Sequence, residues 1–234
     1  MSEHENVLIV GAGRGLSASL ARLCAKEGMQ VGLAARDAGK LGPLVQETGA
    51  RAWSCDASKP ADVDRLFDAF AKEVGAPDLV VYNPSYRARG AIAEVDRDET
   101  LKALMITCYG GFLVGQAAAQ RMLPRGKGTI IFTGASASVK GYVNSAPFAM
   151  GKFGLRGLCQ SMARELAPKN IHVAEVLVDG GIARPSDDPR GVRDRGPDGL
   201  LDPDAIADTY LYLHRQPRNA WTWEIEVRPW VETF

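Results

Sequence analysis

The chain alternates between short apolar runs and longer segments in which apolar residues recur at helical spacing. An apolar run of four to eight residues predicts a buried strand, whereas a period near 3.6 predicts a helix with one face on a core. The predicted strands are 6–10, 30–35, 51–55, 78–82, 128–133, 171–178 and 223–227. The predicted helices are 16–27, 38–48 with a break near Pro43, 59–74, 98–122, 147–167 and 203–215. This alternation predicts an α/β fold, a single Rossmann-like doubly wound domain over residues 1–234, with a parallel sheet of about seven strands flanked by helices.

One segment departs from the alternation. Residues 180–199 are rich in glycine, proline, aspartate and arginine and show no periodicity. Long irregular segments inside compact domains are often lids over a binding site. Because this segment follows a predicted strand, we expect a substrate lid, with a plain solvated loop as the alternative.

Composition narrows the function classes. The 234 residues are 46% hydrophobic, enough for one core. With 28 basic and 28 acidic residues the formal net charge is zero, which gives no support for a nucleic-acid or anionic-membrane surface. No stretch reaches the roughly 18 consecutive apolar residues of a membrane span. An acidic start without a signal peptide predicts a cytoplasmic protein, and scattered cysteines and histidines predict no metal site.

A glycine-rich loop connects the first predicted strand to the first predicted helix. It contains Gly11, Gly13, Arg14, Gly15 and Leu16. Glycines allow close backbone approach, and a helix N-terminus supplies free N–H groups and a positive dipole end. We therefore expect this loop to bind the pyrophosphate of a dinucleotide.

The residue after the second predicted strand indicates which of the two nicotinamide dinucleotides the chain binds. At this distance, about 20 residues beyond the glycine loop, NAD-binding chains usually present an acid to the ribose hydroxyls. Here the position is Arg36, preceded by two alanines. Arg36, helped by Arg14, can pair with a 2′-phosphate, which predicts NADP(H) over NAD(H). The alternative is that both arginines are solvated surface charges.

Further runs resemble the short-chain dehydrogenase/reductase family over nearly the whole chain. They are the glycine loop, with Ser17 in place of its last glycine, Cys55-Asp56-Ala57, Val81-Tyr82-Asn83-Pro84-Ser85, and Ser161–Leu166 followed by Asn170–Val173. The resemblance implies that Asp56, Ala57, Asn83 and Ile182 also contact the cofactor. It further implies that Lys152 binds the nicotinamide ribose.

The same resemblance shows where this chain departs from the family. Phe148 takes the place of the catalytic tyrosine, Ala135 that of the serine and Thr107 that of the asparagine, while Lys152 is kept. The run Ala220-Trp221-Thr222-Trp223-Glu224 resembles the ending of a branch of the family that also has phenylalanine before the lysine. This favours a branch pattern over damage in one chain.

These changes alter the expected mechanism. A phenyl ring cannot donate a proton, and loss of a positioned acid typically costs about 10²–10⁴-fold in rate. We expect reduction of an activated carbonyl or C=C small-molecule substrate, either protonated by water or by a relocated donor acting with Lys152. Tyr142 and Ser136 are the leading candidates for that donor. The other hydroxyls considered are Ser138, Tyr82 and Tyr109. The alternative function is a catalytically inactive NADP(H)-binding sensor or partner subunit.

Assembly is a further implication of the resemblance. The family forms its dimers through the helices that correspond to 98–122 and 147–167, and both are rich in small residues here. The C-terminal segment carries Trp221, Trp223 and Trp230, which are unfavourable to leave exposed. We expect a homodimer or homotetramer.

Overall fold

Seven parallel strands form one twisted sheet in the order β3-β2-β1-β4-β5-β6-β7. The computed structural model describes residues 4–185 and 195–233. The strands are β1 (Asn6–Val10), β2 (Gln30–Ala35), β3 (Arg51–Ser54), β4 (Leu79–Tyr82), β5 (Thr129–Thr133), β6 (His172–Val178) and β7 (Glu224–Val227). Each predicted strand is confirmed, with its ends within one residue of the expected bounds.

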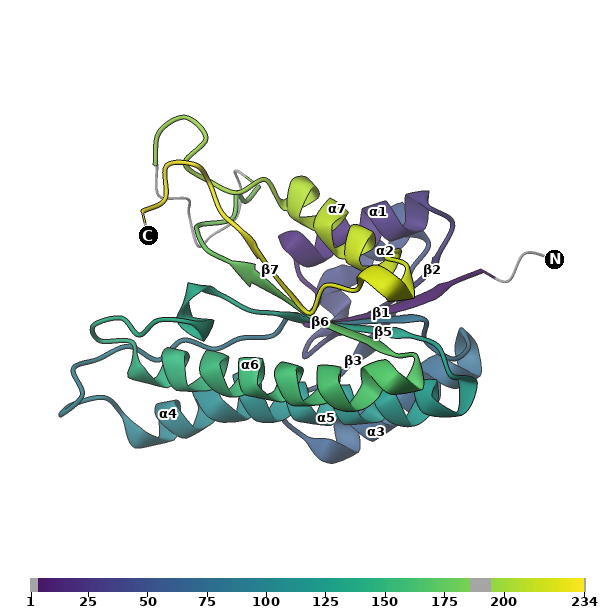
Figure 1. The fold of residues 1–234 in the computed structure, drawn as a ribbon, viewed down its shortest axis with the longest axis horizontal. Helices are drawn as coiled ribbons and strands as arrows, with labels where there is room; N and C mark the ends of the chain where they lie inside the picture. The colour runs from purple at the N-terminus through teal and green to yellow at the C-terminus, as the bar shows by residue number, and fades with distance from the viewer. Residues whose placement is uncertain (1–3, 186–194, 234) are drawn as a thin grey trace.

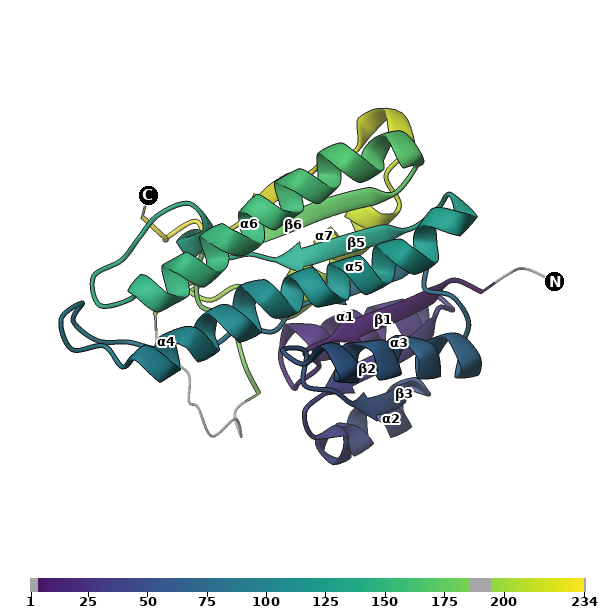
Figure 2. The same ribbon diagram turned by 90° about the horizontal axis from the view of Figure 1, so that it is seen from below.

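Helices cover both faces of the sheet (Figures 1 and 2). One face carries α1 (Leu16–Lys26), α2 (Gly42–Thr48) and α7 (Pro203–His214), and the other carries α3 (Pro60–Glu73), α4 (Arg97–Leu104), α5 (Gly110–Met122) and α6 (Ala146–Leu166). Alternate residues of β1 enter opposite cores: Val7 and Ile9 pack toward α1 and α7, and Leu8 and Val10 toward α3 and α5. The central strands β1, β4 and β5 are largely apolar because both of their faces are buried.

Two predicted helices are interrupted. The segment 38–48 begins as a 3₁₀ helix, Ala38–Leu41, and continues as α2 with Pro43 in its first turn, where a missing N–H costs nothing. The segment 98–122 is α4 and α5 joined by a π-helical turn, Met105–Tyr109, in which Gly110 N donates to Met105 O. Such turns often mark functional sites. This one contains Thr107, the residue expected at the family's asparagine position.

The helical run Arg97–Arg125 is long and apolar enough to cross a membrane by length and composition, but half of its apolar window is buried. Its α5 portion packs on β4, β5, α3 and α6. Its apolar character is therefore explained by burial under the sheet.

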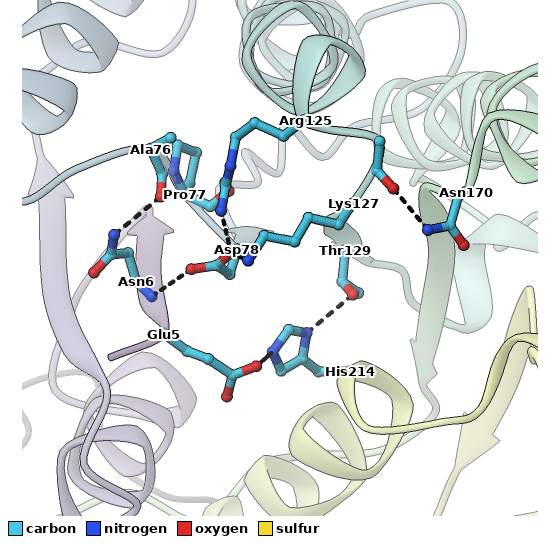
Figure 3. Close-up of polar contacts among 11 residues, drawn as sticks. Glu5, Asn6, Ala76, Pro77, Asp78, Arg125, Lys127, Thr129, Asn170 and His214 are labelled. Atoms are coloured by element: carbon cyan, nitrogen blue, oxygen red, sulfur yellow. Dashed lines mark hydrogen bonds and ion pairs between the residues drawn. The ribbon is translucent and has the colours of Figure 1, made fainter. Parts of the chain in front are cut away.

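The amino edge of the sheet is held together by polar contacts (Figure 3). Asp78, directly before β4, accepts hydrogen bonds from Asn6 N (3.0 Å) and from Arg125 Nη2 (2.6 Å). His214, at the end of α7, contacts Thr129 Oγ1 through Nδ1 at 2.9 Å. These contacts tie the starts of β1, β4 and β5 together. Ligands of parallel sheets bind at the opposite, carboxyl edge, so we interpret this cluster as structural.

Both ends of the predicted lid lie close together. Ile182 and Leu201 form a parallel bridge, in which Ala183 N donates to Leu201 O and Leu201 N to Gly181 O, each at 2.8 Å. Within 180–199, residues 186–194 lie outside the described residues, so the lid stays a prediction.

Candidate cofactor and active site

The glycine loop lies directly above β1, at the carboxyl edge. Gly11 has φ +83°, and a Cβ there would approach Pro84 to 2.7 Å, so glycine is required on both counts. A Cβ on Gly13 or Gly15 would meet no atom within 4 Å, which leaves the loop open on that side. No side chain caps the start of α1, and its first turn carries no acid. The loop therefore fits an anionic group at a helix N-terminus.

Ser17 and Asn83 brace this loop. Ser17 is buried, and its Oγ donates to Gly11 O (3.1 Å) and accepts from Asn83 Nδ2 (2.7 Å). Asn83 follows β4, whose neighbour β1 marks the point where the strand order reverses, the usual ligand crevice of such sheets. Asn83 thus positions the glycine loop, and its direct contact with a cofactor stays a prediction.

Arg14 and Arg36 are both exposed at this edge. The acid that follows Arg36 is engaged elsewhere, because the Asp37 carboxylate accepts from Gly39 N (3.1 Å) at the start of the 3₁₀ helix and lies 3.4 Å from Lys40 Nζ. The end of β2 therefore presents Arg36 while the neighbouring acid caps a helix, an arrangement that suits a phosphate.

Asp56 is fixed at the end of β3. Its Oδ1 accepts from Ser58 N (3.1 Å) and Ser58 Oγ (2.7 Å), and its own N–H donates to Asp62 Oδ2 (3.0 Å). The carboxylate remains 30% exposed. Ala57 is buried behind it. An adenine contact at Asp56 stays a prediction.

Lys152 projects from α6 into the interior at the end of β5. It is buried, and its Nζ donates to Thr133 O at 2.6 Å. Burial lowers the pKa of Lys152 to about 8, and the charge of Arg87 adds to this, whereas the carboxylate of Glu175 opposes it. The ammonium group is therefore held in place by one backbone acceptor, and the charge of one buried acid acts on it from nearby.

Glu175 is a site residue that the sequence reasoning missed. It lies in β6 with no exposed surface, and its Oε1 accepts from Ser138 Oγ at 2.9 Å. Its Oε2 is buried without a hydrogen-bond partner among residues 4–185 and 195–233. Burial raises the pKa of Glu175 to about 7, while the Ser138 hydrogen bond and the charge of Lys152 act in the other direction. The missed signal was a single acid inside the otherwise apolar run Val173–Val178.

The positions expected to match the family's tyrosine and serine form an apolar surface. Phe148 and Ala135 are buried together with Ala137 in a small separate cluster. Thr107, at the asparagine position, is buried and accepts from Tyr86 N at 3.1 Å. The side chains of Phe148, Ala135 and Ala137 in this cluster carry no hydroxyl, and the Thr107 hydroxyl is engaged with Tyr86 N.

The two leading candidates for a proton donor lie nearby on the loop after β5. Tyr142 is 44% exposed, and Lys140 Nζ lies 5.5 Å from its ring centroid. Ser136 is half-buried and begins the 3₁₀ helix Ser136–Ser138. Within the described part of the chain, Lys152 Nζ hydrogen-bonds Thr133 O and neither of these hydroxyls. Their catalytic roles stay predictions.

The remaining candidate hydroxyls have structural partners. Tyr82 is buried and donates to Ile106 O, and burial raises its pKa. Ser138 is buried against Glu175. Tyr109 stacks on Phe112 with ring centroids 6.1 Å apart. Packing therefore accounts for these three side chains.

Two hollows elsewhere are poor candidates for this site. One of about 340 Å³ lies at the amino edge beside Asp78 and Arg125, and one of about 310 Å³ lies beside Ile206 and Arg228. Neither is lined by the glycine loop or by Lys152. Among the residues the structure describes, no group of three or more His, Cys, Asp or Glu side chains could hold a metal.

Comparison with known proteins decides the family. The family model for short chain dehydrogenases matches residues 5–183, more than half of the chain. The chain belongs to the short-chain dehydrogenase/reductase family.

Individual members of the family agree with this assignment. The crystal structure of a short-chain dehydrogenase from Rhodopseudomonas palustris is 36% identical, with a TM-score of 0.83 over 97% of this chain and 99% of that one. The 3-oxoacyl-[acyl-carrier-protein] reductase MabA of Mycobacterium tuberculosis is 29% identical over 177 residues, 76% of this chain and 69% of that protein. A metagenomic short-chain oxidoreductase solved in complex with NADP is 26% identical, with a TM-score of 0.82 over 96% and 97% of the two chains. The protein is therefore an oxidoreductase of the short-chain type.

Proposed function

We propose that this short-chain oxidoreductase uses NADP(H) to reduce an activated carbonyl or C=C small molecule without a tyrosine proton donor. The observation that carries the proposal is the environment of Lys152. Its ammonium group is buried and fixed on Thr133 O, at the end of β5, beside the apolar surface of Phe148 and Ala135.

The cofactor side of the proposal is supported by the open glycine loop. Gly11, Gly13 and Gly15 would hold the pyrophosphate, and Arg14 and Arg36 the 2′-phosphate. Asp56, Ala57 and Ile182 would line the rest of the nucleotide site. When bound, the nicotinamide supplies the hydride. The NADP in the related metagenomic enzyme is consistent with this choice.

The chain's own residues orient the cofactor and keep water away from part of the substrate. Lys152 binds and orients the ribose through its charge. Phe148 and Ala135 exclude water from one side of the substrate, which favours a substrate that needs little help from a protein acid. Tyr142, Ser136 or water supplies the proton.

Cofactor titration tests the first part. By isothermal titration calorimetry we expect NADPH to bind at least about tenfold more tightly than NADH, because a guanidinium–phosphate pair is a strong charge-assisted contact. Arg36→Asp should reverse this order, and Lys152→Met should weaken both dinucleotides. The matched control is Lys169→Met, an exposed lysine beyond the end of α6. Equal binding of NADPH and NADH by the wild type would contradict the assignment.

A turnover panel tests the second part. NADPH consumption should occur with α,β-unsaturated carbonyl compounds and activated ketones and be slow with simple ketones. Tight NADPH binding without turnover on any of these compounds would favour the alternative function, an NADP(H)-binding sensor or partner subunit, which the loss of hydroxyls at Phe148 and Ala135 supports. Homo-oligomerisation and a cytoplasmic location stay predictions. Exposed Phe112 and Phe153 on the helix layer favour the former.

A further inference from the structure

The loop after β4 places a cation against the aromatic ring at the family's tyrosine position. Arg87 Cζ lies 4.2 Å from the centroid of the Phe148 ring, within the range of a cation–π contact. Phe148 is buried, whereas part of Arg87 is exposed. The N–H groups of Arg87 are thus held next to the ring that would otherwise carry the proton donor.

Two more arginines act on this position. Arg89 comes from the same loop and Arg184 from the segment after β6, and both are exposed. Burial has the largest effect on the pKa of Arg87 and lowers it. The charges of Arg89 and Arg184 lower this pKa further. Like charges repel, so an anion bound beside Arg87 would relieve the unfavourable effect of these two cations.

The buried carboxylate at this edge of the sheet is engaged elsewhere. Asp179, directly after β6, lies 4.0 Å from Lys140 Nζ and 3.7 Å from Arg228 Nη2. Tyr142, on the neighbouring loop, raises the pKa of Arg87. The positive charge of Arg87 therefore lies directly against the ring at the position expected to match the family's tyrosine.

We propose that Arg87, Arg89 and Arg184 bind a carboxylate group of the substrate, so that the enzyme acts on an oxo acid or an unsaturated acid. This inference rests on the proposed function and names the substrate class of the same site. A guanidinium forms two parallel hydrogen bonds with a carboxylate, which would fix the substrate's orientation. Because Arg87 lies on Phe148, the carboxylate lies within a few bonds of the reacting carbon.

The test uses matched acid and ester probes. Calorimetric titration of the protein, with and without NADPH, would compare 2-oxohexanoate and trans-2-hexenoate with their methyl esters, and with hexyl phosphate. We expect each acid to bind at least about tenfold more tightly than its ester and to be the preferred substrate in the NADPH assay, and we expect Arg87→Gln and Arg184→Gln to remove this preference. Arg164→Gln, an exposed position on α6 with the same change in charge, should keep it.

The possible failures are distinguishable. A wild-type protein that does not bind NADPH contradicts the proposed function. A wild-type protein that binds NADPH but binds acid and ester equally overturns only the carboxylate inference. Tighter binding of hexyl phosphate than of 2-oxohexanoate overturns the choice of carboxylate. Normal NADPH binding by Arg87→Gln and Arg184→Gln shows that these variants are folded, so a retained acid preference in both overturns the assignment of the arginines.

Discussion

The buried acid Glu175 should make folding stability depend on pH in a way that one substitution removes. Its carboxyl pKa is raised from 4.5 to about 7, chiefly by burial. The groups around it are Ser138 on the loop after β5, Lys152, Arg156 and Cys159 on α6, Tyr210 on α7 and Glu224 on β7. Glu175→Gln keeps the size of the side chain and removes its proton.

The sign and size of this pH dependence follow from the difference in proton binding between the folded and the unfolded protein. Between pH 4.5 and pH 7 the folded protein holds a proton on Glu175 that the unfolded chain has released, so the free energy of unfolding falls as pH rises. At about 1.4 kcal/mol per pH unit, the loss reaches roughly 3 kcal/mol by pH 7. The Gln variant lacks this loss. Its stability relative to wild type should therefore rise by roughly 3 kcal/mol over the same range.

Lys152 should contribute little to this difference. Its pKa of about 8 keeps it charged across this window. Glu175 holds its proton over most of the same window, so the substitution removes little negative charge beside Lys152.

Urea unfolding at pH 5, 6 and 7, at one fixed protein concentration and without cofactor, measures the part of this difference that develops between pH 5 and pH 7, which is roughly 2 kcal/mol. The matched control is Glu165→Gln, an exposed acid on the same helix as Lys152, whose difference from wild type should stay within about 0.5 kcal/mol. If the wild-type and Glu175→Gln stabilities run parallel from pH 5 to 7, then Glu175 is ionised throughout, and pairing with Lys152 outweighs its burial.

Three further outcomes follow from the described contacts. Phe148→Tyr combined with Ala135→Ser should gain reduction of simple ketones by about 10²-fold or more in the NADPH assay, and normal NADPH binding without such a gain would mean that the pocket has diverged further. Asp78→Asn weakens the 2.6 Å pair with Arg125 at the amino edge and should cost about 1–3 kcal/mol in urea unfolding, against about 0.5 kcal/mol or less for Asp68→Asn, whose side chain is 77% exposed. Phe153→Asp on exposed α6 should lower the sedimentation coefficient toward that of a monomer, and an unchanged coefficient would exclude this helix from the interface.

The elements of this fold could be read from the sequence because each has one strong local cause. Both sides of every central strand are buried, so strands such as 6–10 appear as continuous apolar runs. The π-helical turn at Met105–Tyr109 could not be predicted from the sequence. The spacing of apolar residues along this helix does not change where the turn widens, so the pattern carries no signal for it. The hydrogen bond from Tyr86 N to Thr107 in that turn joins residues 21 apart in the chain.

The site was only partly predictable for a similar reason. The glycine loop and Lys152 have local sequence patterns, and the structure places both at the carboxyl edge. Arg87 lies in a loop without periodicity, and its position over Phe148 is a contact between residues 61 apart. Glu175 was visible as an acid in an apolar strand, but its partner Ser138 is 37 residues earlier, so only the folded chain shows that the two form one hydrogen bond.

The residues expected to depart from the family pattern are physically connected, which bears on how the site works. Glu175 fits in the core because residue 134 is a glycine, since a Cβ there would overlap its Oε1. Ser138, which donates to that oxygen, also accepts from the N–H of Ala135, at the family's serine position. The apolar surface of Ala135 and Phe148 is thus connected through Ser138 to a buried acid. Ionisation of this acid costs roughly 3 kcal/mol. Perturbed ionisable groups of this kind concentrate at functional sites. A site that had only lost its donors would not need this acid, so the connected set supports the chemistry proposed at Lys152 over the alternative of an inactive NADP(H)-binding sensor or partner subunit.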